Sequence, residues 1–267
     1  MRSIQSTAII LISLLLILSG CTSGGAGSSA SGQSPPGAPD DGTYSDPVEG
    51  ITLGLDLDEE IPEDSPIQVS GTPTLVTGVD GGKAYEFDAV GEYLRVPADE
   101  SNDLTGESAA IELWIMPKVN KTGAGILHKG TASDWSDESY SLQYNSPGEL
   151  AFIITNEEGV HTYVISKAPK LAVDTWYHIV VTWDQTQVMI YVNGVDVEKK
   201  YYQNGWKSSL PANFAPMRSS DGDLMIGTQL PDSQPEYRFE GIIDKIRLYD
   251  RLLEADEVVE HYSEEDV

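Results

Sequence analysis

The stretch Thr175–Val197, TWYHIVVTWDQTQVMIYVNGVDV, decides the fold of this chain. Apolar side chains alternate through it with a period of two, which is the spacing of a β-strand with one buried face. They fall at Tyr177, Ile179, Val181 and Trp183 and, after the turn DQT, at Val188, Ile190 and Val192. The Asn193-Gly194 pair that follows favours the positive φ angles of a tight hairpin turn. The stretch therefore predicts short antiparallel strands joined by tight turns.

Strand patterns of the same kind recur from Ile51 onward. They are ITLGLDLD, AYEFDA, EYLRVP, AIELWIM, GILHKG, YSLQYN, ELAFIIT, VHTYVIS, DLMIGT and FEGIIDKIRLYD. Many short strands with frequent turn signals are typical of two packed antiparallel sheets. Near the end, Ala255, Val258, Val259 and Tyr262 follow helical spacing and predict a short C-terminal helix against the sandwich. We expect one all-β domain over residues 49–265.

Several of these segments, in this order, resemble the LamG-like jelly roll of the concanavalin A-like lectin/glucanase superfamily, to which the pentraxins are related. The resemblance rests on YEFDAVGEYLRVP, IELWIMP, WYHIVVTWD, IYVNG and FEGIIDKIRLYDRLL, and it covers nearly all of residues 51–262. One departure is Ala89, where the family usually carries Gly. The resemblance implies a two-sheet antiparallel jelly-roll sandwich. Function stays open, because this fold carries lectins, adhesion modules, enzymes and spacers.

The chain lacks the catalytic pattern of the superfamily's glucanases. Those enzymes carry E-x-D-x-E on one strand, and retaining chemistry needs two carboxyl groups about 5–5.5 Å apart. No candidate strand here has this pattern, and Glu112 is alone on its strand. The G-x-S-x-G nucleophile motif is also missing. We expect a protein that is not an enzyme.

The resemblance to pentraxins implies a calcium site between two loops, ASDWSDESY and TQLPDSQPEY. Carried over by position, the ligands are Asp134, Asp137, Glu138, Gln229 and Asp232. Calcium takes six to eight oxygen ligands, which carboxylates and amides supply. However, pentraxins have a richer acidic run where this chain has Gln229-Leu230-Pro231-Asp232. The alternative is that Asp134 and Asp137 form the solvated tip of an acidic surface.

A structural calcium beside the first and last strands is a second metal hypothesis. Related jelly rolls often hold such an ion, and Asp88 and Asp244 would be its donors here. The alternative is that these aspartates bond to backbone amides at a turn and at a strand end.

Exposed aromatic rings are candidates for sugar binding, because the C–H faces of pyranoses stack on them. Trp135 lies in the first acidic loop, and Tyr202 and Trp206 lie in the segment KKYYQNGWKSSLPANFAPMRSSDG. We expect that segment to be a long loop, a kind of segment that is often functional. The alternative is that these rings pack over an open end of the sandwich.

Charge and cysteine usage limit which partners, disulfides and metal sites are possible. Lys and Arg total 16 against 43 Asp and Glu, a net charge of −27, so nucleic acid and anionic lipid are excluded as partners by repulsion. Cations are attracted instead, although the charge alone favours solubility or adaptation to salt as its explanation. The single cysteine, Cys21, cannot form an internal disulfide. The histidines, at 128, 161, 178 and 261, are too scattered for a zinc motif.

The N-terminus predicts export and lipidation. Residues 1–21, MRSIQSTAIILISLLLILSGC, combine Arg2 with an apolar run too short to cross a bilayer of about 30 Å. LSGC resembles the prokaryotic lipobox, which implies cleavage before Cys21 and acylation of its thiol and new amino terminus. Residues 22–48 form a Gly/Ser/Pro tether that cannot bury enough surface to fold. As a coil it would hold the domain roughly 30 Å from its anchor.

Together these features predict a lipid-anchored extracytoplasmic protein, attached to a cell membrane or outer surface only through its lipid. Its LamG-like domain would bind carbohydrate or a cell-surface protein, with calcium as a candidate cofactor. The alternative is a structural or adhesive envelope module without a small ligand. A third alternative is a polysaccharide hydrolase or lyase whose catalytic pair the sequence conceals.

Overall fold

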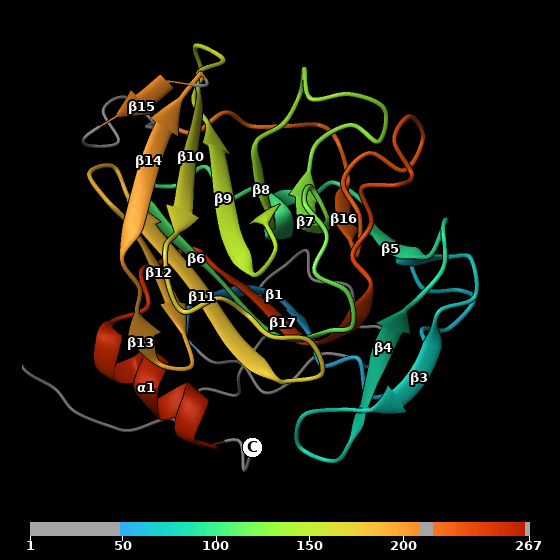
Figure 1. The fold of residues 1–267 in the computed structure, drawn as a ribbon. Helices are drawn as coiled ribbons and strands as arrows, with labels where there is room; N and C mark the ends of the chain where they lie inside the picture. Colours follow the sequence, from blue (N-terminus) through green and yellow to red (C-terminus); the bar gives the residue numbers. More distant parts are fainter. Residues whose placement is uncertain (1–48, 205, 209–215, 265–267) are drawn as a thin grey trace, which may run out of the picture. The chain divides into compact units, whose positions relative to one another are not determined.

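The alternating segments form two antiparallel sheets in the computed structural model, which describes residues 49–204, 206–208 and 216–264 (Figure 1). The eight-stranded sheet has the order β13 (Val195–Asp196), β12 (Val188–Val192), β11 (Tyr177–Asp184), β6 (Ser108–Pro117), β17 (Gly241–Tyr249), β4 (Lys83–Phe87) and β3 (Thr74–Thr77), with β1 (Ile51–Leu55) also paired to β17. The nine-stranded sheet has the order β15 (Trp206–Ser208), β14 (Lys199–Gln203), β10 (His161–Ser166), β9 (Glu149–Thr155), β8 (Tyr140–Ser146), β7 (Gly125–Lys129), β16 (Leu224–Ile226), β5 (Tyr93–Val96) and β2 (Gln68–Ser70). A 3₁₀ turn, η1 (Glu100–Asn102), and the helix α1 (Ala255–Glu264) complete the described elements.

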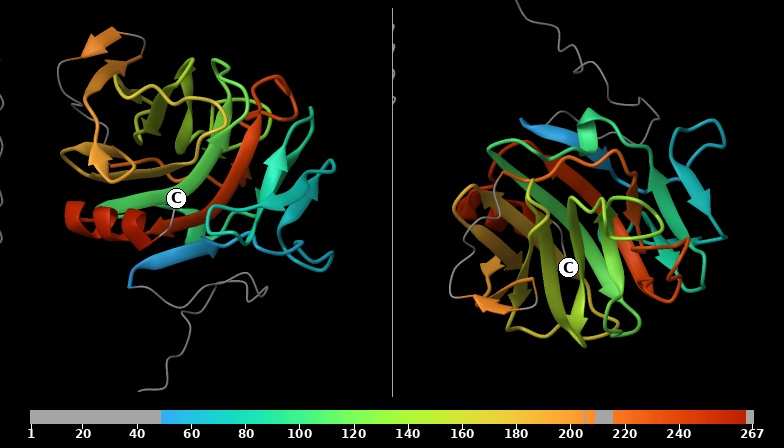
Figure 2. Two further views of the ribbon diagram at one scale, coloured as in Figure 1. Left: turned by 60° about the horizontal axis from the view of Figure 1, so that its bottom comes forward. Right: turned by 90° about the horizontal axis from the view of Figure 1, so that it is seen from above.

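The hydrophobic core lies between the two sheets, which Figure 2 shows as separate layers. Ile179, Val181 and Trp183 of β11 face it from the eight-stranded sheet, as their period-two spacing predicts. Phe152 and Val164 face it from β9 and β10 of the other sheet, and Phe152 lies 5.0 Å from Trp183 between ring centroids. The predicted jelly-roll sandwich is confirmed.

The tight turn at Asn193-Gly194 is also confirmed. Both residues have positive φ, at 52° and 74°, and they join β12 to β13 with Val192 opposite Val195. Asparagine and glycine tolerate this conformation better than other residues do, which is why the pair specifies the turn.

Helix α1 lies beside β12 and β13 in Figure 1, and only part of the stripe expected to face the sandwich is buried. Val258 is fully buried against Val180, Tyr191 and Tyr249, on the eight-stranded sheet's other side from the main core. Val259, which was expected on the same face, has 48% of its surface exposed. Half-buried His261 and Tyr262 lie three and four residues from Val258 on the same face, so Tyr262 is where the spacing predicts and His261 is an addition.

The segment expected as a long aromatic loop is strand over much of its described length. Lys199–Gln203 pairs with β10 as strand β14, and Trp206–Ser208 pairs with β14 as β15. Every residue of β14 is half-buried, so its sequence lacks the apolar alternation that identifies a strand. Its place in the sheet is fixed by backbone pairing near an edge, which leaves little trace in a hydropathy pattern.

The signal peptide, the lipobox with Cys21 and the tether at residues 22–48 all lie outside the described residues. Within the described ranges, the helices are too short or too polar to span a bilayer.

Candidate functional site

The outer face of the nine-stranded sheet carries a cleft built by neighbouring strands. On β10, Val164 points into the core, so Tyr163 and Ile165 point outward. The register of β14 places Tyr202 opposite Tyr163 and Lys200 opposite Ile165. Side chains at paired positions share a face, and these therefore form one surface.

This surface encloses a cleft of about 220 Å³, which we call the tyrosine cleft. Its lining is Asn145, Tyr163, Ile165, Lys200 and Tyr202. Both tyrosines are half-buried, so their rings are held in place yet still reach solvent. Aromatic faces beside an amide and an ammonium group offer stacking together with hydrogen-bond donors and an acceptor.

One carboxylate at the edge of the tyrosine cleft orients two of its polar groups. Glu149 Oε2 accepts hydrogen bonds from Lys200 Nζ at 3.0 Å and from Asn145 Nδ2 at 3.2 Å. The hydrogen bond from Lys200 lowers the pKa of Glu149, which therefore stays ionised and keeps both partners in position. The polar side of the cleft is thus fixed before any ligand arrives.

Further along the same face, Glu138 is a buried anion beside β8. Its Oε1 accepts a hydrogen bond from Ser141 Oγ at 2.7 Å and lies 3.5 Å from His128 Nδ1, while Oε2 lies 3.3 Å from His161 Nδ1. Burial alone would raise the pKa of Glu138, but the two imidazoles outweigh burial and lower it to about 2. Glu138 thus faces the sheet and its histidines, away from the loop tip where a calcium ligand was expected.

The two loops of the calcium hypothesis lie side by side, as the resemblance implied. The backbone N–H of Asp232 donates to the carbonyl oxygen of Ala132 at 3.0 Å. The rings of Trp135 and Tyr237 lie 6.3 Å apart between centroids. Contacts of this kind bring the tips of both loops to one place on the molecule.

The oxygen ligands proposed for calcium do not converge within these loops. Asp134 is exposed and accepts from the backbone of Ser136 at 2.7 Å, and Asp137 accepts from Ser220 Oγ at 2.7 Å. Gln229 is buried and Asp232 is exposed. Over the described part of the chain, no group of three or more His, Cys, Asp and Glu side chains is arranged to hold a metal ion. Calcium at these loops stays a prediction.

The two aspartates of the alternative metal site lie apart. Asp88 is exposed just beyond the end of β4, where Phe87 pairs with Gly241. Asp244 is buried three residues further along β17 and accepts hydrogen bonds from the backbone N–H groups of Val79 and Lys245. With about 3.3 Å per residue along a strand, the two carboxylates are too distant to share one ion. For Asp244, this is the backbone-bonded role that was the alternative.

The candidate sugar-binding rings are divided between two places. Tyr202 lines the tyrosine cleft, whereas Trp135 is 39% exposed in the loop beside Tyr237. The backbone of Trp206 begins β15, but its side chain is outside the part that the structure describes. Sequence reasoning missed Tyr163 because it occupies an ordinary outward position on a strand.

Glu112 is a second buried acid, and the sequence did not indicate its partners. Its Oε1 lies 2.7 Å from His178 Nε2, and its Oε2 accepts from the Tyr249 hydroxyl at 2.5 Å. His261 Nδ1, from α1, lies 3.1 Å from both oxygens. The Glu112 cluster, as we call these four residues, ties the helix to the eight-stranded sheet.

Comparison with known proteins supports the fold. A profile described as the concanavalin A-like lectin/glucanases superfamily, Laminin_G_3, matches residues 88–259. The search of curated proteins gave no match.

Two similar solved structures are binding domains by their descriptions. The binding domain of Paraclostridial Mosquitocidal Protein 1 is 17% identical, with a TM-score of 0.59 over 80% of this chain and 52% of that one. The binding domain of botulinum neurotoxin serotype G is 13% identical, with a TM-score of 0.57 over 80% and 50%. This chain thus spans about half the length of those toxin domains.

A third similar structure is domain 4 of AbnA, an extracellular GH43 arabinanase from Geobacillus stearothermophilus, in complex with arabinotriose. It is 17% identical, with a TM-score of 0.52 over 79% of this chain and 97% of that domain. At these identities the likeness shows the fold alone. Since the family profile matches well over half of its length, this chain belongs to the concanavalin A-like lectin/glucanases superfamily.

Proposed function

We propose that this protein is a non-catalytic carbohydrate-binding protein and that its ligand lies in the tyrosine cleft. The observation that carries the proposal is the pairing of Tyr163 and Tyr202 on one outward surface, beside polar groups that Glu149 holds in place. Sugars offer apolar C–H faces to such rings, and their hydroxyl groups pair with fixed amide and ammonium groups. The superfamily membership and the arabinotriose complex of the AbnA domain support this ligand class.

The absence of catalysis is proposed from the positions of the buried acids. Glu112 and Glu138 are each 1% exposed and are engaged by histidines. The described residues that line the tyrosine cleft include no carboxylate. A hydrolase of the retaining kind would need two carboxyl groups facing one glycosidic bond. Incubation with a panel of polysaccharides should therefore release no reducing sugar; release that survives Tyr202→Ala and is lost in Glu138→Gln would point to an enzyme.

Glycan binding by the full-length protein tests the proposal. On an array that includes arabinotriose, the protein should bind at least one oligosaccharide, and Tyr163→Ala and Tyr202→Ala should each weaken that binding about tenfold, which corresponds to about 1.4 kcal/mol. The matched control is Tyr93→Ala, because Tyr93 is a half-buried tyrosine of β5 in the same sheet but outside the cleft. An array without any bound glycan, or an equal loss in all three variants, would contradict the proposal and favour a protein partner.

We also propose that the domain works outside the cytoplasm, held by acyl groups on Cys21 at the end of the tether. Support comes from the lipobox-like LSGC, from the apolar run before it and from the composition of residues 22–48. A lipid-anchored binding domain can reach glycans at a cell surface while staying attached to its cell.

Calcium enters the proposal only through Asp134, Asp137 and Asp232 of the two adjoining loops. Thermal melts with calcium and then with excess chelator test it, because a ligand bound only to the native form stabilises by RT ln(1 + [L]/Kd). A midpoint that rises with calcium in the native protein, but not in Asp137→Asn, would support the ion at these loops. An unchanged midpoint would remove calcium from the proposed function.

A further inference from the structure

A second cleft opens between the two sheets at one end of the sandwich, away from the lining of the tyrosine cleft. We call it the end cleft; its volume is about 210 Å³. Its floor comes from both layers, with Ile154 at the end of β9 and Trp183 at the end of β11. Met217 closes the floor from the connection before β16.

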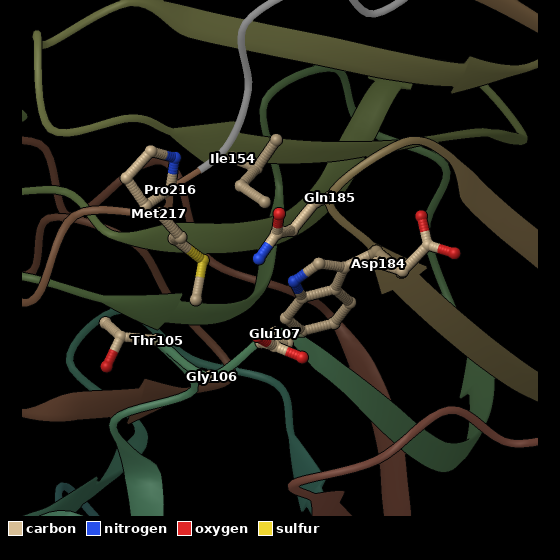
Figure 3. Close-up of a pocket in the computed structure, with 9 residues that line it drawn as sticks. Thr105, Gly106, Glu107, Ile154, Asp184, Gln185, Pro216 and Met217 are labelled. Carbon is tan, nitrogen blue, oxygen red and sulfur yellow. The ribbon is translucent and has the colours of Figure 1, made fainter. Parts of the chain in front are cut away.

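The side chains of the floor are apolar and are barely exposed to solvent. Ile154, Trp183 and Met217 are 0%, 3% and 5% exposed, and the Trp183 ring is fixed against Phe152 in the core. Figure 3 shows the side chains of Ile154, Gln185 and Met217 converging on the same space. A cleft of about 210 Å³ with an apolar floor has room for a short aliphatic chain or a single ring.

The rim of the end cleft is acidic. Asp184 pairs with Ser108 across β11 and β6, so Glu107, the residue before Ser108, reaches the same rim. Among the described residues of the lining, there is no Lys, Arg or His. The rim therefore presents negative charge above an apolar floor.

The two rim carboxylates are in different states. Asp184 Oδ1 already accepts from the backbone N–H groups of Thr186 and Gln187, at 2.6 and 2.9 Å. Burial alone would raise the pKa of Asp184, but these hydrogen bonds outweigh burial and lower it, so Asp184 is a fixed anion. Glu107, in contrast, is exposed and has no hydrogen bond or ion pair with any residue in the described ranges. Glu107 is the acceptor that is free to receive a donor.

We propose that the end cleft binds a small organic cation, in which an ammonium group is carried on a short apolar chain or ring. The apolar part would lie on Ile154, Trp183 and Met217, and the ammonium group would meet Glu107 and Gln185 at the rim. Charge complementarity selects a cation over a neutral or anionic analogue, since the net charge of −27 adds attraction at long range. This site goes beyond the proposed glycan binding and does not depend on it.

Calorimetric titration of the full-length protein with phenethylammonium chloride tests the site, with 2-phenylethanol and 3-phenylpropanoate as neutral and anionic analogues. We expect saturable binding of one cation per chain, about tenfold weaker binding of the alcohol and no binding of the carboxylate. Glu107→Gln should weaken binding of the cation about fivefold to tenfold while glycan binding stays unchanged. Glu63→Gln, at an exposed glutamate outside the cleft, is the matched control and should have no effect.

A second variant tests the floor. Met217→Trp fills the end cleft and should abolish binding of both the cation and the alcohol. Equal affinity for the cation, the alcohol and the carboxylate would overturn the proposal, as would the absence of saturable binding. An equal effect of Glu107→Gln and Glu63→Gln would show that only the overall charge attracts the cation, and it would overturn the site as well.

Discussion

At the scale of single residues, the Glu112 cluster brings four polar side chains into contact, although no pattern in the sequence indicates that they meet. Removal of the carboxylate leaves His178, His261 and Tyr249 without their shared acceptor. Breaking a buried charged pair in this way costs about 3–5 kcal/mol. We expect Glu112→Ala to lower the free energy of unfolding in urea by this amount.

The control for that measurement is Glu198→Ala. Glu198 pairs with Lys167, but its side chain is 74% exposed, and exposed pairs contribute only about 0–1 kcal/mol. If both variants lost the same stability, the buried contacts of Glu112 would contribute no more than an exposed ion pair, which would contradict the prediction.

The same cluster should make stability depend on pH in a defined window. The hydrogen bond to Glu112 raises the pKa of His261 above its ordinary 6.5, so its stabilisation is complete below pH 6.5 and is lost as pH rises through the raised pKa. Burial would raise the pKa of Glu112, but His178 and His261 outweigh burial and hold it below its ordinary 4.5. The stabilisation from Glu112 is therefore complete above pH 4.5 and is lost as pH falls toward the lowered pKa.

It follows that the difference in unfolding free energy between the native chain and Glu112→Gln should be greatest between about pH 4.5 and 6.5. Denaturant unfolding at a series of pH values measures this difference. A difference that stays constant from pH 3 to pH 9 would contradict the coupling of Glu112 to the histidines.

At the scale of elements, helix α1 contains two adjacent valines, one buried and one exposed. Val258 is fully buried and Val259 is 48% exposed. Removal of two buried methyl groups costs about 1.5–3 kcal/mol at roughly 0.8 kcal/mol for each carbon plus a cavity term. We expect Val258→Ala to lower the unfolding free energy by that amount and Val259→Ala to change it by less than about 0.5 kcal/mol. A larger loss in Val259→Ala than in Val258→Ala would contradict the burial of Val258 against the sheet.

The elements that the sequence predicts well are those whose periodicity records burial on one face. β11 and β12 alternate because the main core takes every second residue, and their strands and turn appear as expected. In β14, all five residues are half-buried, so KKYYQ carries no period and was expected to be a loop. For α1, the expected stripe included both Val258 and Val259, and only Val258 is buried, by packing against Tyr191 and Tyr249.

The candidate sites were harder to predict because their residues meet only through the fold. Glu112 and His261 are 149 residues apart in sequence, and Glu112 and His178 are 66 apart. A spacing rule cannot connect such positions. Tyr202 was a candidate from composition, whereas its partner Tyr163 became visible only when β10 and β14 were found in register. Topology determines which distant residues meet, and no pattern in a single sequence indicates these contacts.

At the scale of the whole molecule, a net charge of −27 opposes the folded state by self-repulsion. Salt screens that repulsion, since the Debye length falls from about 10 Å at 0.1 M to about 3 Å at 1 M. We expect the thermal midpoint to rise by about 2–8 °C when NaCl is increased from 0.1 to 1 M, equivalent to roughly 1–2 kcal/mol. KCl should act equally, because screening does not distinguish the two cations. A midpoint that is flat or falls with salt would show that local ion pairs outweigh the net charge.

The proposed anchor at Cys21 would determine where the domain acts, and the energetics of acyl chains provide a test of it. Each buried CH₂ of an acyl chain contributes about 0.8 kcal/mol, and one chain holds a protein to a membrane only reversibly, whereas several hold it stably.

In the native chain, acylation at Cys21 should place the protein in the membrane fraction and label it with a radioactive fatty acid. Cys21→Ser removes the thiol, so the variant should lose the label, while Ser19→Ala, beside the same cleavage position, should keep it. Since the variant leaves residues 49–264 unchanged, glycan binding should be the same in both, which separates location from recognition. Labelling that persists in Cys21→Ser would rule out this cysteine as the lipidation site.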